Sequence, residues 1–120
     1  MRIDTSPTRD GSGGLVVAHG EVDLATVSRL RDAVSDHLSQ GRTRLLLDLS
    51  AVTFIDSTGL GVIVGAAKKA YGLGGSLELV CDNPRILRLL TITGLARSFP
   101  VHATLADAGA DADVAPAAST

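Results

Sequence analysis

Apolar residues change their spacing several times along the chain, and each change predicts a new element. Residues 2–8 predict a weak strand, and the glycine-rich turn after it predicts a hairpin into a second strand at residues 15–19. Apolar residues then recur at every third or fourth position, which predicts one buried face of a helix. That face comprises Val27, Leu30, Val34 and Leu38. Asp23 and Thr26 are both suited to cap the start of this helix, and Gly41 is suited to end it.

The middle of the chain holds its most apolar stretch, at residues 45–49. The aliphatic residues run almost without interruption instead of alternating with polar ones, which is typical of a strand covered on both faces. A helix is predicted next, at residues 57–71. We expect Gly61 and Gly65 to let this helix approach the sheet closely, because glycine has no side chain. The apolar face of this helix comprises Leu60, Ile63, Val64, Ala67 and Tyr71.

The last part of the predicted domain holds a strand, a helix and a short final strand. The strand spans residues 76–81, and Asn83 followed by Pro84 is a strong start signal for the helix. Residues 95–101 predict the final strand, which we place at an edge of the sheet because Pro100 cannot donate a backbone hydrogen bond.

Strands that alternate with helices predict an α/β fold with right-handed crossovers. We therefore expect a mixed, mostly parallel sheet of four to five strands with an antiparallel first strand, and helices that cover the sheet. Residues 1–107 are predicted to form one domain, which suits a chain of 120 residues. Residues 108–120 are rich in Ala and Asp and predict a disordered tail.

Composition and charge argue against several classes of function. Aromatic residues make up only 2% of the chain, whereas proteins that bind single-stranded nucleic acid stack bases on aromatic side chains. The net charge of −2 and the lack of a basic stripe argue against direct binding to duplex DNA. No apolar stretch reaches the ~18 residues of a membrane span, and the first residues lack the apolar region of a signal peptide. Cys81, the single cysteine, fits a reducing cytoplasm and predicts a small buried apolar residue.

Candidate chemistry centres on Ser57, which lies in a polar turn between the apolar strand and the helix. Three roles are open for it: attack on a substrate, capping of the helix, or acceptance of a phosphate group. A catalytic serine in such a turn follows the pattern G-x-S-x-G. Gly59 supplies the second glycine, but Ile55 stands where the first is needed, so the hydrolase pattern is incomplete.

A hydrolase would also need a base, and the sequence offers three histidines for it. His37 lies beside the apolar stripe of the first helix, which predicts a half-buried or surface position. His19 and His102 lie in or near strands, and the sequence shows no carboxylate partner for either. There is also no phosphate-binding loop with its lysine and no Cys/His cluster. We therefore expect no enzymatic activity, no metal and no cofactor.

Capping is the structural interpretation of Ser57. Serine is among the best N-cap residues and typically contributes about 1 kcal/mol to helix stability. Asp56 is also favoured there, because the helix dipole stabilises a negative charge at this end. Capping alone does not account for Asp56 and Thr58 beside the serine, which make the turn unusually polar. The residues by themselves leave a purely structural role and a functional role open.

A family resemblance favours the functional role. Residues 52–62 (VTFIDSTGLGV) are similar to the signature of the STAS-domain anti-sigma factor antagonists, also called anti-anti-sigma factors. Residues 20–23 (GEVD) resemble a second turn typical of that family. Residues 45–50 before the signature, and residues 85–87 and 92–95 after it, fall in the order that the family uses.

The resemblance covers roughly residues 1–107 and implies a non-enzymatic bacterial regulator of transcription that works by partner switching. It implies that a partner which is both anti-sigma factor and serine kinase phosphorylates Ser57. The unphosphorylated form would bind that partner and free the sigma factor, and a serine phosphatase would restore it. The partner-binding residues would be Glu21, Asp23, Asp56, Ser57, Thr58, Gly59 and Leu60.

The alternative interpretation is a STAS module that serves as a scaffold or senses a small ligand. Ser57 would then only cap the helix and would never be phosphorylated. In either case exposed faces could support a homodimer, and we expect no direct nucleic-acid or membrane partner.

Overall fold

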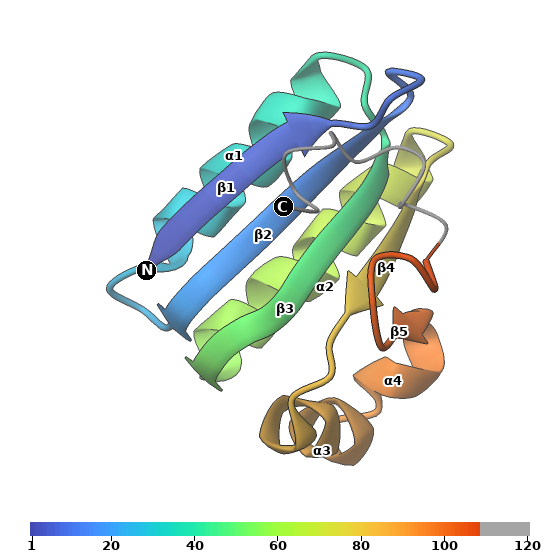
Figure 1. Cartoon of the computed structure of the whole chain (residues 1–120). Coiled ribbons are helices and arrows are strands. Elements are labelled where there is room, and N and C mark those ends of the chain that lie inside the picture. Colours follow the sequence, from blue (N-terminus) through green and yellow to red (C-terminus); the bar gives the residue numbers. More distant parts are fainter. Residues whose placement is uncertain (109–120) are drawn as a thin grey trace.

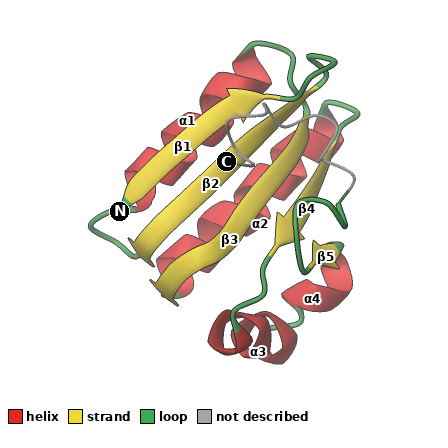
Figure 2. Cartoon of the chain, in the orientation of Figure 1, coloured by secondary structure: helices red, strands yellow, loops and turns green. Residues whose placement is uncertain are grey.

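A computed structural model describes residues 1–108 of the chain. Figure 1 shows the path of the chain, and Figure 2 shows the same view coloured by secondary structure. The elements in chain order are β1 (Arg2–Pro7), β2 (Gly13–Val22), α1 (Val27–Ser39), β3 (Arg44–Ile55), α2 (Ser57–Gly72), β4 (Ser76–Val80), α3 (Pro84–Ile92), α4 (Leu95–Ser98) and β5 (Val101–His102).

The strands form one sheet in the order β1-β2-β3-β4-β5. β1 is antiparallel to β2, and the other three strand pairs are parallel. This confirms the predicted mixed sheet with an antiparallel first strand. α1 and α2 lie side by side against one face of the sheet, and α3 follows the carboxyl end of β4 (Figure 1). Within residues 1–108 no helix combines the length and apolar character that crossing a bilayer requires.

The main core lies between the sheet and the pair α1 and α2. The predicted stripe of α1 is confirmed: Val27, Leu30 and Val34 are buried, and Leu38 packs against the core from a half-buried position. The predicted stripe of α2 is correct for Ile63 and Ala67, which are buried. Tyr71 departs from it, because its side chain is 48% exposed near the end of the helix.

The opposite face of the sheet has a smaller core of its own. Leu46 is fully buried there, together with Leu15 and Val80. The cover is not a helix but the segment after β5, which contributes Leu105 and Ala108. The prediction that the central strand is covered on both faces is therefore confirmed, while helices cover only one of them.

Two predictions near the C-terminus have different outcomes. The predicted strand at residues 95–101 is wrong over most of its length, because Leu95–Ser98 forms α4 and only Val101–His102 remains as β5. The helical turn follows from Gly94, whose φ of 83° redirects the chain after α3. β5 does lie at an edge of the sheet, as Pro100 predicts. Residues 109–120, which hold nearly all of the predicted tail, lie outside the described residues.

His37 corrects another prediction, because it is buried between α1 and the sheet with 2% of its surface exposed. The Nε of Arg42 donates to Nδ1 of His37 at 2.8 Å, so the ring proton lies on Nε2 and is donated to the hydroxyl of Thr5. Gly14 lies against the ring, and a Cβ there would be only 2.2 Å from it. Burial lowers the pKa of His37, and the positive charge of Arg42 lowers it further.

The lowered pKa predicts that acid weakens the fold through His37. The unfolded chain binds a proton at about pH 6.5, where folded His37 remains neutral, so stability falls as the pH drops below that value toward the folded pKa. Urea denaturation at pH 7.5 and pH 5.0 measures this effect. We expect His37→Gln to show a smaller loss of stability between the two pH values than the native chain. An unchanged pH dependence in His37→Gln would contradict this assignment.

Candidate functional site

The carboxyl ends of β2 and β3 bring two loops together at one edge of the sheet. Val22 pairs with Ile55 at the end of the two parallel strands, so the segments that follow them start side by side. The backbone N–H of Asp56 donates to the carbonyl of Val22 at 3.1 Å. The β2–α1 loop and the first turn of α2 therefore form one continuous surface.

Asp56 holds this surface together with both oxygens of its carboxylate. Oδ1 accepts from the backbone N–H of Gly59 at 3.0 Å, which makes Asp56 the N-cap of α2. Oδ2 accepts from the backbone N–H of Leu24 in the neighbouring loop at 3.2 Å. The prediction that Ser57 caps the helix is therefore wrong. Asp56 has extended backbone geometry and takes the cap position, whereas Ser57 is already the first helical residue.

Ser57 is left exposed and available for chemistry. Its hydroxyl makes no hydrogen bond to any residue in the described part of the chain. The position is the N-terminus of a helix of 16 residues, where unpaired N–H groups and the helix dipole stabilise negative charge. An added phosphate would therefore meet a favourable backbone environment without displacing an existing contact of the serine.

The loop between β2 and α1 is ordered by its own side chains. Oδ1 of Asp23 accepts from the backbone N–H groups of Ala25 and Thr26 at 3.0 and 3.1 Å. Thr26 occupies the N-cap position of α1, but its side chain makes no capping bond, and its hydroxyl donates to the carbonyl of Glu21 at 2.8 Å. Of the two predicted caps, Asp23 accepts hydrogen bonds from free backbone N–H groups, and Thr26 links the loop to β2 through its bond to Glu21.

Two large apolar side chains stand exposed beside the acidic residues of this surface. Leu24 is 77% exposed in the loop, and Phe54 is 49% exposed near the end of β3. Phe54 lies opposite Glu21 in the register of β2 and β3, and Glu21 is also exposed. Leu24 and Phe54 were not predicted as site residues, although an apolar residue beside the GEVD turn and another within the signature were visible signals. Exposed apolar groups with a polar rim are typical of protein-binding sites.

Gly59, and not Gly61 or Gly65, is the glycine that allows close packing of α2. A Cβ at Gly59 would lie 2.8 Å from side-chain atoms of Val22 and of Ile55. A Cβ at Gly61 or Gly65 would meet no atom within 4 Å, so the prediction for those two glycines is wrong. The rotation of the helix explains the difference, because it turns Gly59 toward the sheet and leaves the later glycines facing outward.

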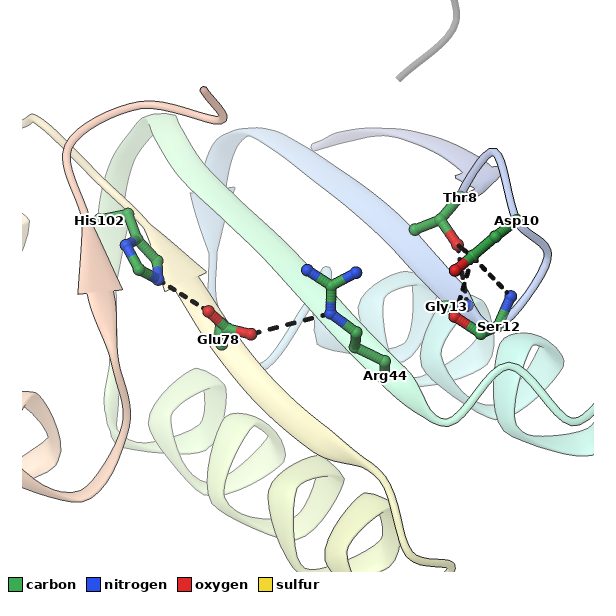
Figure 3. A network of polar contacts seen from close by, with 7 residues as sticks. All are labelled: Thr8, Asp10, Ser12, Gly13, Arg44, Glu78 and His102. Carbon is green, nitrogen blue, oxygen red and sulfur yellow. Dashed lines mark hydrogen bonds and ion pairs between the residues drawn. The ribbon is translucent and has the colours of Figure 1, made fainter. Parts of the chain in front are cut away.

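The histidines do not complete a hydrolase site. His19 bonds to Asp4 at 2.9 Å. His102 bonds to Glu78 at 2.7 Å, and Arg44 lies 3.9 Å from the other oxygen of Glu78 (Figure 3). Both histidines thus have the carboxylate partners that the sequence did not show. Neither these two nor the buried third histidine contacts the serine of α2 within residues 1–108.

Other candidate chemistry has a structural explanation. Figure 3 also shows the β1–β2 turn, where Asp10 accepts from Thr8 and from the backbone and hydroxyl of Ser12 at 2.8 to 3.0 Å. These bonds lower the pKa of Asp10. Cys81 is buried as predicted, and burial raises the pKa of its thiol and so disfavours the reactive thiolate. Among the described residues no three potential metal ligands are grouped together.

Comparison with known proteins decides the family. The model of the STAS domain matches residues 6–108. The chain belongs to the STAS-domain family. The anti-sigma-B factor antagonist of Bacillus subtilis (strain 168) is 42% identical to it over 103 residues, which cover 86% of this chain and 94% of that protein.

Solved STAS structures have the same fold. The crystal structure of an anti-sigma factor antagonist from Mycobacterium paratuberculosis matches with a TM-score of 0.76 and 31% identity, over 89% of this chain and 91% of that one. The Bacillus cell fate determinant SpoIIAA in its phosphorylated form matches with a TM-score of 0.70 over 89% and 96% of the two chains. At 23% identity this second likeness shows the fold alone.

The division of roles between Asp56 and Ser57 predicts different effects on stability. Asp56→Ala removes the cap of α2 and the bond to Leu24, and we expect a loss of about 1–2 kcal/mol in the free energy of unfolding. Ser57→Ala removes no bond and should change it by less than about 0.5 kcal/mol. Urea denaturation measures both values.

Asp56→Asn is the matched control for this comparison. Its single amide oxygen can keep the cap bond to Gly59 but cannot also accept from Leu24, so we expect an intermediate loss of stability. A Ser57→Ala variant as unstable as Asp56→Ala would show that the serine, after all, carries the cap.

Proposed function

We propose that this STAS-domain protein is an anti-sigma factor antagonist that is switched by phosphorylation of Ser57. The observation that carries the proposal is the exposed, unbonded hydroxyl of Ser57 at a helix N-terminus that Asp56 caps independently. The names of the relatives, which are anti-sigma factor antagonists, support the same function. The protein is in this proposal a regulator and a substrate of other enzymes, with no catalytic site or cofactor of its own.

The unphosphorylated form binds the anti-sigma factor through the surface around Ser57. Leu24 and Phe54 supply apolar area that becomes buried on docking, and Glu21 and Asp23 supply charged and polar contacts. Six of the seven residues that the family resemblance implies for this surface are at least partly exposed, and buried Gly59 supports it from below. These residues are Glu21, Asp23, Asp56, Ser57, Thr58, Gly59 and Leu60.

Phosphorylation acts on binding through charge and not through the fold. The phosphate adds about −1.5 to −2 charges at pH 7, which the N-terminus of α2 can accommodate. It adds them beside Asp23 and Asp56, so a partner would have to desolvate a dense group of negative charges. Unfavourable charges in an interface cost several kcal/mol, and every 1.4 kcal/mol weakens binding about tenfold. The phosphorylated structure of SpoIIAA supports retention of the fold, because that protein has this fold in its phosphorylated form.

The complete cycle has three steps. The anti-sigma factor, acting as a serine kinase, first transfers the γ-phosphoryl group of ATP to the hydroxyl of Ser57. It then releases ADP and the phosphorylated chain. A serine phosphatase hydrolyses the phosphate ester and restores the binding form. We place this cycle in the bacterial cytoplasm, where the released sigma factor acts.

The switch is tested with the native chain, Ser57→Ala and Ser57→Asp. The native chain is used to capture its partner from a lysate of the source organism, and the captured protein is identified and purified. We expect an anti-sigma factor that phosphorylates Ser57 with ATP, as read by phosphopeptide mass spectrometry. Titration calorimetry should show Ser57→Ala binding within about threefold of the native chain, and Ser57→Asp binding at least about tenfold more weakly.

Three outcomes would contradict the proposal. Equal binding by Ser57→Asp and Ser57→Ala would remove the charge mechanism. Absence of phosphate on Ser57 in the presence of the purified partner and ATP would favour a scaffold or a ligand sensor. Labelling of Ser57 by a fluorophosphonate would instead indicate a serine hydrolase.

A further inference from the structure

A groove runs between α1 and α2 and begins beside the phosphorylation surface. It consists of two adjoining hollows of about 290 and 460 Å³, which share Ser35 and Lys69 in their walls. The first hollow reaches Thr58, the residue after Ser57, and the second ends at Leu73. At 1.5 Å per helical residue, the span from Thr58 to Leu73 is ~22 Å, or about four helical turns.

The helix α2 leaves this groove open at two positions. Gly61 and Gly65 line the first hollow one turn apart, and within residues 1–108 a Cβ on either would meet no atom within 4 Å beyond its chain neighbours and the nearby backbone of its own helix. Each glycine lowers helix stability by about 1 kcal/mol relative to alanine. Packing within residues 1–108 therefore requires neither glycine, and both widen the groove at the end nearest to Ser57.

The charge of the groove is opposite to that of the surface at its end. Arg31 from α1 and Lys69 from α2 line it, and no acidic residue does so within the described chain. Neither cation forms an ion pair or side-chain hydrogen bond in that part of the chain. The remaining walls are formed by glycines, by residues with hydroxyl groups, and by the apolar residues Val34, Leu38, Val62, Ala66 and Leu73.

We propose that this groove is a second part of the docking surface and takes an acidic amphipathic helix of the anti-sigma factor. The inference rests on the proposed function and adds the chemistry of the partner to it. An apolar groove with a charge on each wall suits a helix with one apolar face and flanking Asp or Glu residues. Continuity with Thr58 means that one partner can contact Ser57 and fill the groove at the same time.

The basic groove and the acidic surface around Ser57 would together select the partner. A partner must present acidic residues to Arg31 and Lys69, and must tolerate Asp23 and Asp56 at the other end. A protein that satisfies only one of these requirements places like charges together at the other, which opposes binding. The groove would thus add specificity that the signature residues around Ser57 cannot supply alone.

Charge reversal in the groove tests the proposal, with the purified anti-sigma factor captured above as the probe. We expect the double variant Arg31→Glu/Lys69→Glu to bind at least about tenfold more weakly, because two attractive contacts become repulsive. Lys68→Glu is the matched control: Lys68 is exposed on the same helix but lines neither hollow, so its change should alter affinity less than about twofold. Thermal melting of each variant checks that the fold is retained.

Filling the groove is an independent test that does not depend on charge. Gly65 is half-buried, but Gly65→Leu places a side chain in the open space of the groove, so the variant should fold with a melting temperature at or above the native one. We nevertheless expect it to bind the anti-sigma factor at least about tenfold more weakly, because the side chain occupies the space of the partner helix.

The outcomes separate this proposal from the proposed function. Native affinity in both the charge-reversed and the filled variant would overturn the groove proposal, while the loss of binding in Ser57→Asp would still support the switch. If the native chain captures no anti-sigma factor, the switch and the groove proposal fail together. Equal weakening by Lys68→Glu and by the groove variants would indicate general electrostatic attraction and would also overturn the groove proposal.

Discussion

The carboxylate of Asp56 is the interaction on which the functional surface depends. It accepts one bond from the first turn of α2 and one from the loop between β2 and α1, so two segments 32 residues apart are held by one side chain. Parallel pairing of β2 and β3 makes this possible, because it ends both strands at the same edge of the sheet. The sheet register and this one carboxylate therefore join the two segments, while the bonds of Asp23 and Thr26 order the loop itself.

The rest of the fold provides a rigid base for that edge. The larger core of the sheet is covered by α1 and α2, and close packing of α2 begins at Gly59, in the first turn of the helix. At the opposite end of the sheet, His37 joins α1 to β1 and to the segment before β3 through Thr5 and Arg42. None of these stabilising contacts involves Ser57, whose hydroxyl makes no hydrogen bond within residues 1–108.

Much of this fold could be predicted from the sequence, because its signals are local. The spacing of Val27, Leu30 and Val34 and the pair Asn83–Pro84 define elements within one or two turns of helix. What could not be predicted depends on register or on helix rotation. The pairing of Val80 with His102 brings that histidine beside Glu78, and nothing near either residue in the sequence indicates it.

The N-cap of α2 shows the same limit of prediction from the sequence. Asp56 and Ser57 are both good N-cap residues, so the helix could begin at either by propensity alone. In the structure Asp56 takes the cap position, and its second oxygen accepts from Leu24, a contact that needs β2 and β3 to have paired. For the same reason the family signature could identify Ser57 as a candidate site but could not show that Asp56 is the residue that caps α2.

The independence of Asp56 and Ser57 has an evolutionary consequence. Asp56 makes the cap bond to Gly59, and the hydroxyl of the adjacent Ser57 makes no hydrogen bond within residues 1–108, so under the proposed function the fold and the switch can change separately. A lineage that lost the serine would keep the folded domain and the bond between the two loops, and a single substitution would restore the proposed switch. A phosphorylation switch of the proposed kind can therefore be gained or lost while the domain stays folded.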